Sequence, residues 1–147
     1  MAGTVAPEAI VHRSRGTVRT DVTILTDASG VATASVVGVG FGPLVGVLYN
    51  GGLDASAVIT VTDAKTGATK LTYTTGAEGT PTAFRPTEVI TDNAGVAVAA
   101  AASAPNVNRD ILFSGKVKVG VTAGGNVETG IISFIVDEAG IAPQAFK

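Results

Sequence analysis

An aspartate followed three or four residues later by a glycine recurs along the chain, close to small apolar residues. The occurrences are TDASGVATAS (26–35), TDAKTGATKL (62–71), TDNAGVAVAA (91–100) and VDEAGIAPQA (136–145). Aspartate at the first position of a β-turn accepts backbone N–H groups, and glycine tolerates the positive φ that closes the turn. A calcium loop would need oxygen ligands where alanine stands here. The repeat therefore predicts turns between short strands, with no bound metal or cofactor.

Between these turns the chain shows the period-two alternation of half-buried β-strands. It is clear in VRTDVTILT (18–26), and residues 57–62 and 70–74 form the best-defined hairpin, around the second of the turns. In the last third, residues 111–121 and 127–137 are strand-like and flank TAGGN, which has the glycines of a hairpin turn. No capped amphipathic helix is evident. We predict an all-β fold, an antiparallel β-sandwich or barrel with an extended N-terminal arm.

Some segments are less regular. Residues 31–40 and 43–50 are β-rich but interrupted by glycines, which suits bulges or close backbone approach. GVGFG lacks the Lys-Ser/Thr pair of a phosphate loop, so bulging is the better interpretation. Residues 75–91 form a long excursion with one short extended piece at 88–91. Helix and strand compete in VAVAAAA (96–102), where the flanking turn signals favour a short strand or turn.

Length and composition limit the function classes. A chain of 147 residues suits one domain, and we expect an extended arm over residues 1–17 and a single β-rich domain over 18–147. The formal net charge of −2 does not suggest the basic surface that nucleic-acid binding proteins carry. No apolar run is long enough for a membrane span. The mean hydropathy of +0.42 predicts burial against other subunits, as a homodimer or homotrimer.

Patterns of catalytic residues do not stand out. The single histidine, His12, lies in the arm, which disfavours a Ser-His-Asp triad or a multi-histidine metal site. The carboxylates lie mostly in expected loops or at strand ends, so we predict that the protein is not an enzyme. Arg109 and Asp110 can form an ion pair. Lys116 and Lys118 fall on one face of a strand, as a solvated face or as protection of a sheet edge.

Two segments carry residue types suited to contact with another protein. The arm mixes basic and apolar residues that can lie over a more acidic neighbouring subunit; the alternative is an ordinary frayed terminus. The second segment is the aromatic-Arg-Pro element within the 75–91 excursion. The candidate contact residues are Val11, His12, Arg13, Arg15, Phe84 and Arg85.

Three blocks stand out as an ordered set: GPLVGVLYNGGLDASAVITVTDAKTGATKLT (42–72), AFRP (83–86) and GKVKVGVTAGGNVETGIISFIVDE (115–138). Together they resemble a family of small β-rich virion structural proteins of tailed bacteriophages. The resemblance covers roughly residues 40–138. It implies no active site and a role as a head decoration (cement) protein bound to the phage major capsid protein. The expected location is the outer surface of the head, after synthesis in the host cytoplasm.

Two other functions remain as alternatives. A tail tube, tail terminator or fibre component would use similar Val, Thr and Gly-rich strands to build rings or trimers. A carbohydrate-binding or host-surface module could place its site on the long loop at 75–86. That module is disfavoured because sugars stack on exposed aromatic rings, and the chain has no tryptophan and only Tyr49 and Tyr73, both in expected strands.

Overall fold

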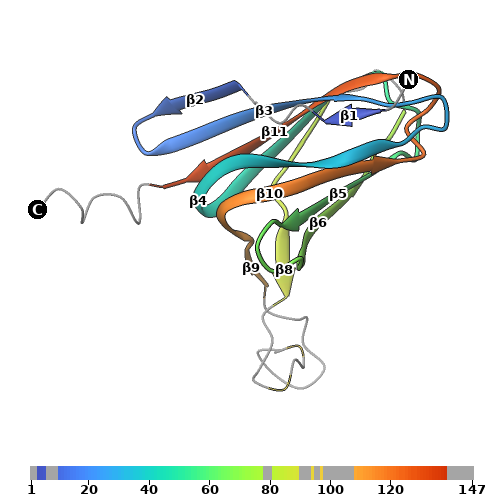
Figure 1. Ribbon diagram of the computed structural model, residues 1–147. Helices are drawn as coiled ribbons and strands as arrows, with labels where there is room; N and C mark the ends of the chain where they lie inside the picture. The colour runs from blue at the N-terminus through green and yellow to red at the C-terminus, as the bar shows by residue number, and fades with distance from the viewer. Residues whose placement is uncertain are drawn as a thin grey trace, which may run out of the picture.

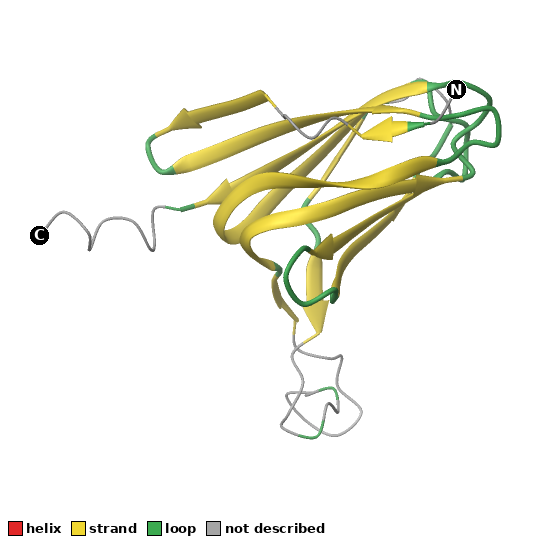
Figure 2. Cartoon of the chain, in the orientation of Figure 1, coloured by secondary structure: helices red, strands yellow, loops and turns green. Residues whose placement is uncertain are grey.

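The computed structural model describes residues 3–5, 10–77, 81–89, 94, 97 and 108–138. The secondary structure in these ranges is all β, as predicted, with no helix (Figures 1 and 2). A nine-stranded antiparallel sheet folds over on itself into two packed layers, and a two-stranded sheet extends from their edge. The predicted antiparallel sandwich is therefore confirmed.

The long strand β4 (Ala32–Gly51) belongs to both layers. Layer A contains the second half of β4 together with β1 (Thr4–Val5), β2 (Ile10–Ser14), β3 (Thr17–Leu25), β7 (Thr82–Phe84) and β11 (Thr129–Asp137). Layer B contains the first half of β4 together with β5 (Val58–Asp63), β6 (Thr69–Thr74) and β10 (Leu112–Thr122). The small sheet pairs β8 (Thr87–Val89) with β9 (Asn108–Asp110).

The glycine-rich segments at 31–40 and 43–50 are one bent strand. β4 pairs with β10 as far as Pro43 and with β11 from Leu44 onward. The bend contains Gly40 and Gly42, which have φ values of +92° and +148°. A Cβ on Gly42 would overlap the carbonyl oxygen of Asp137, so the close approach requires glycine. The expected bulge is present as a register shift between β4 and β10.

The core lies between the two layers. Inward-facing residues alternate along each strand, so that β3 contributes Val22 and Ile24 and β10 contributes Val117 and Val119, all almost fully buried. Across the layers, Phe113 of β10 contacts Phe134 of β11, with ring centroids 5.6 Å apart in an edge-on arrangement. Apolar burial on this face stabilises the sandwich.

Two of the four predicted Asp-Gly turns lie in the described residues, and both are confirmed. Asp27 Oδ1 accepts the N–H groups of Ser29 and Val31 at 2.8 and 3.0 Å, and Gly30 closes the turn at φ +78°. Asp63 acts in the same way, since its Oδ1 accepts the N–H groups of Lys65 and Thr66. Most of the turn at 92–95, the segment 139–145 and most of the 96–102 run lie outside the described residues.

The predicted hairpin around TAGGN is wrong. The strands on either side, β10 and β11, lie in different layers and do not pair with each other. Their connection crosses the end of the sandwich, where Gly124 donates its N–H to Gly30 and accepts the N–H of Asp54. A Cβ on Gly124 would lie 2.6 Å from Thr26 Cγ2. These glycines therefore allow close packing between loops. In the sequence, glycines that serve this purpose look the same as glycines that close a tight turn.

Candidate interaction surfaces

The described part of the N-terminal segment lies along β3. Val5 in β1 is buried and pairs with Ile24, and β2 pairs with the start of β3. The strands β1 and β2 of this segment pair with β3 within layer A, and the boundary expected after residue 17 falls just inside β3, which begins at Thr17. The β2–β3 hairpin lies at the outer edge of this layer and leaves Val11 and His12 exposed (Figure 1).

The tip of this hairpin has an unusual backbone. Arg15 and Gly16 form a two-residue turn with φ values of +49° and +82°. Both signs are those of a type I′ turn, which normally takes asparagine, aspartate or glycine at the first position. A left-handed conformation at a long side chain costs roughly 1–2 kcal/mol. Arg15 is nevertheless exposed at the tip, where its guanidinium is available to a partner.

Arg13 is bound within the chain. Its Nη1 donates to Glu138 Oε1 at 2.8 Å, and the other carboxylate oxygen of Glu138 accepts the N–H of Phe41 at 2.9 Å. The N–H of Glu138 also donates to the carbonyl of Gly16. Glu138 thus joins the β2–β3 hairpin to the bend of β4. This role was not foreseen from sequence, because the two partners in the ion pair are 125 residues apart.

His12 belongs to a polar cluster on the outer face of layer A. Ser133 Oγ donates to Asp21 Oδ1 at 2.6 Å, Arg19 Nε donates to the same oxygen at 2.9 Å, and His12 Nε2 lies 3.4 Å from Asp21 Oδ2. The aspartate stands between the serine and the histidine. A catalytic triad requires the histidine to contact the serine, so this cluster does not have triad geometry.

The same cluster shifts the pKa of Asp21. Burial alone would raise this pKa, but the hydrogen bonds from Ser133 and Arg19 and the nearby positive charges outweigh it and lower the value. The carboxylate is therefore held in its charged form. A hollow of about 390 Å³ opens beside it, lined also by Leu48, Asn50 and residues 81–83.

Phe84 and Arg85 lie on the opposite edge of layer A from the hairpin, so the structure does not bring the two groups of predicted contact residues together. Phe84 is partly buried; its ring stacks on Tyr73 at 4.9 Å, and Tyr73 lies 5.7 Å from Tyr49. Both tyrosines are thus used in an internal aromatic cluster. This arrangement gives no support to sugar stacking on either ring.

Arg85 lies just before β8, which forms a two-stranded stem with β9. Its guanidinium binds both carboxylate oxygens of Asp110, at 3.0 and 2.6 Å. Arg109 Nε donates to Glu88 Oε1 at 3.0 Å. The expected pairing of Arg109 with Asp110 is therefore wrong. Successive residues of a strand point to opposite faces. Arg109 finds its partner on β8, and Asp110 finds its partner in Arg85, just before β8.

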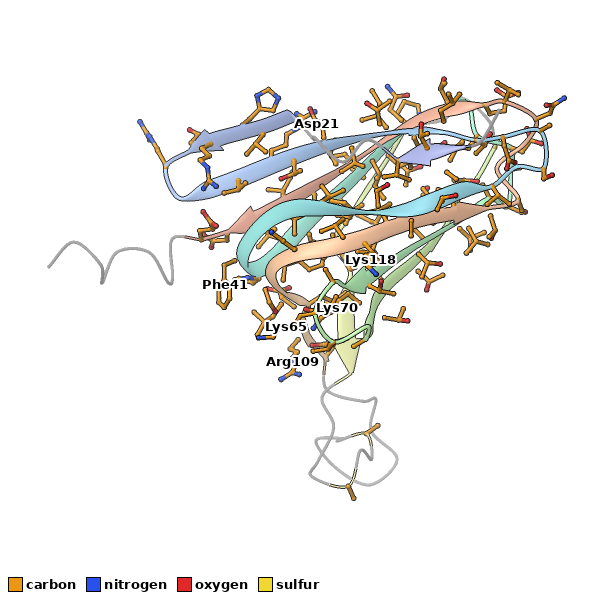
Figure 3. All side chains as sticks on the ribbon, viewed as in Figure 1. Asp21, Phe41, Lys65, Lys70, Arg109 and Lys118 are labelled. Carbon is orange, nitrogen blue, oxygen red and sulfur yellow. The ribbon has the colours of Figure 1, made fainter. Side chains whose placement is uncertain are left out.

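Lys116 and Lys118 lie on one outward face of β10, as predicted, but the interpretation as edge protection is wrong. β10 is an internal strand, paired on one side with β4 and on the other with β5. Lys70 of β6 and Lys65 of the β5–β6 turn lie on the same side of the layer (Figure 3). We call these four residues, Lys65, Lys70, Lys116 and Lys118, the lysine face.

The described residues contain no group of three or more His, Cys, Asp or Glu side chains that could hold a metal ion. None of their secondary structure is a helix long and apolar enough to cross a membrane. Comparisons with protein-family models, with curated proteins and with solved structures found no match. Function must therefore be argued from the surfaces themselves.

Stability should fall at acidic pH. The pKa values of four aspartates lie below the ordinary 3.8: Asp21, Asp27, Asp63 and Asp110. Hydrogen bonds from backbone N–H groups lower the pKa values of Asp27 and Asp63. Hydrogen bonds from Arg85 lower the pKa of Asp110. The unfolded chain then binds more protons, so the stabilisation is complete above the ordinary pKa and is lost as pH falls through the lower folded values.

We expect Tm to be nearly constant from pH 7 to about 5 and to drop steadily below about 4. Scanning calorimetry at fixed ionic strength provides the measurement. Asp63→Asn should flatten this drop, because the amide oxygen can still accept hydrogen bonds but does not titrate. A Tm that stays constant or rises towards pH 2 would contradict the assignment.

Proposed function

We propose that the protein is a bacteriophage head decoration (cement) protein that binds the outer surface of the major capsid protein lattice and stabilises the mature capsid. The three sequence blocks that resemble phage virion proteins support this role, because they fall on the main strands of the fold. The first block covers the second part of β4 with β5 and most of β6, the second lies at the end of β7, and the third covers most of β10 with β11. The resemblance thus extends over strands of both layers.

The observation that carries the proposal is a pair of large apolar side chains on the outer face of layer B. Phe41 is 54% exposed and Leu112 is 49% exposed. Phe41 pairs with Ser114 and Leu112 with Pro43, so the two side chains are diagonal neighbours on one face. Exposed apolar groups that lie together on a small protein mark a surface that another molecule covers.

Binding to heads is the direct test. Purified protein is mixed with mature, empty heads that lack it, and bound protein is measured by cosedimentation and located by cryo-electron microscopy. We expect saturable binding at regular lattice positions and heads that resist heating better. Many copies on one lattice add their modest contacts by avidity. Absence of binding to heads would overturn the proposal, and assembly into rings or binding to tails would favour a tail component.

Matched variants locate the contact. Phe41→Ser with Leu112→Ser should weaken head binding, since it removes apolar surface from the proposed interface. The control is Val31→Ser with Val127→Ser, which removes exposed apolar surface from loops outside the strands that carry Phe41 and Leu112. These two valine side chains are 37% and 48% exposed, and the variant should bind like wild type. Light scattering of the free protein tests the expected homodimer or homotrimer separately.

Arg15→Asn tests the hairpin as a second contact. Asparagine fits the left-handed first position of a type I′ turn better than arginine, so the variant should unfold at the same or a higher temperature. It removes the exposed guanidinium, so we expect severalfold weaker binding to heads. Unchanged affinity with raised Tm would remove the hairpin tip from the interface.

A further inference from the structure

The outward face of layer B carries an unbalanced charge. Its strands contain Lys70, Lys116 and Lys118, and the adjacent turn adds Lys65. The only carboxylate in the layer B parts of these strands is Asp63, which is 5% exposed and is occupied by the two N–H groups of its turn. Among the described residues, no ion pair shorter than 4 Å involves any of the four lysines.

The neighbours of these lysines are small or uncharged. Lys118 lies between Val36 on β4 and Thr62 on β5, and Lys116 lies opposite Gly38. A hollow of about 550 Å³ beside Lys65 and Lys116 is lined by Gly38, Ser114 and other residues of the turn and bulge. Like charges on one face repel one another. The single carboxylate of Asp63 attracts Lys70, but it cannot balance four lysines. The face is therefore suited to an external partner of opposite charge.

We propose that the lysine face, together with the adjacent apolar pair, docks onto an acidic protein surface. The identity of that partner as the capsid lattice rests on the proposed function, but the charge requirement does not. Nucleic acid fits less well, because phosphate groups would leave Leu112 unmatched. The strands of the face carry no arginine forks, and the ring of Phe41 is a single stacking platform rather than a series of them. Lysines around apolar anchors match the polar rim and buried centre of protein interfaces.

The first test uses a defined acidic polypeptide. Wild-type protein, despite its net charge of −2, should be retained on immobilised poly-L-glutamate at low salt and released as salt rises, because screening weakens the attraction. Lys116→Gln with Lys118→Gln should abolish retention. Thr23→Glu with Asn126→Asp introduces the same change in net charge at exposed positions elsewhere and should leave retention close to wild type. Equal Tm values show that all three proteins are folded.

The second test measures binding to heads with the same proteins. We expect the glutamine variant to bind about tenfold more weakly and the control within about twofold, with a reduced salt dependence in the glutamine variant. Retention on poly-L-glutamate without binding to heads would overturn the proposed function and leave the acidic partner standing. Head binding that the glutamine variant retains in full, absence of lysine-dependent retention, or tighter binding to duplex DNA than to poly-L-glutamate would overturn the docking face.

Discussion

Phe134→Ala should lower the free energy of unfolding by about 3–5 kcal/mol, the cost of deleting a large side chain from a packed core. Phe134 is fully buried and meets Phe113 edge-on between the layers, so the cavity would open where β10 and β11 contact each other. Chemical denaturation monitored by circular dichroism gives the value. The two layers would lose the contact between these two rings.

Phe41→Ala is the matched control, since the same atoms are removed from a ring that is 54% exposed. We expect a change below about 0.5 kcal/mol, as for other surface substitutions. A comparable loss in both variants would show that Phe41 is buried in the folded protein in solution, for example by self-association. A loss below about 1 kcal/mol for Phe134→Ala would contradict the described core.

Gly42→Ala should destabilise the protein by at least about 3 kcal/mol, because two costs combine. The backbone at Gly42 has φ +148°, which a residue with a Cβ rarely adopts, and the new methyl would overlap the carbonyl oxygen of Asp137. Relief of this overlap requires the bend of β4 to move away from the end of β11. Thermal and denaturant unfolding measure the loss.

Gly115→Ala separates the two costs. Gly115 also has a positive φ, +102°, but a Cβ there would meet nothing within 4 Å. This variant should lose only the backbone term, roughly 1–2 kcal/mol. Similar losses in both variants would mean that the close approach between β4 and β11 is absent in solution.

The strands were predictable where alternation and turn chemistry agree. β3, β5 and β6 lie within about two residues of their expected bounds, because both local signals coincide there. β4 was divided in two because glycines mark a bend as readily as a break. The hairpin predicted between β10 and β11 was wrong for a different reason: a loop between layers and a hairpin turn use the same residue types, and the two strands lie in different layers.

The surfaces were less predictable than the strands. Alternation correctly placed Lys116 and Lys118 on one face, but it does not reveal that β5 and β6 bring Lys65 and Lys70 to the same side. Arg13 and Arg85 are predicted contact residues, and the sequence does not reveal that they also bind Glu138 and Asp110. Such pairs depend on how distant strands assemble, which no local pattern contains.

The stem formed by β8 and β9 has a practical consequence. The backbones of Val89 and Asn108 lie opposite each other. Two ion pairs, Glu88 with Arg109 and Arg85 with Asp110, hold the two sides of the stem together. Any segment joining these two residues must start and finish at the same place. Lengthening it with a guest peptide adds a loop-closure cost that grows slowly with length. The stem is therefore a natural grafting site for displaying foreign epitopes.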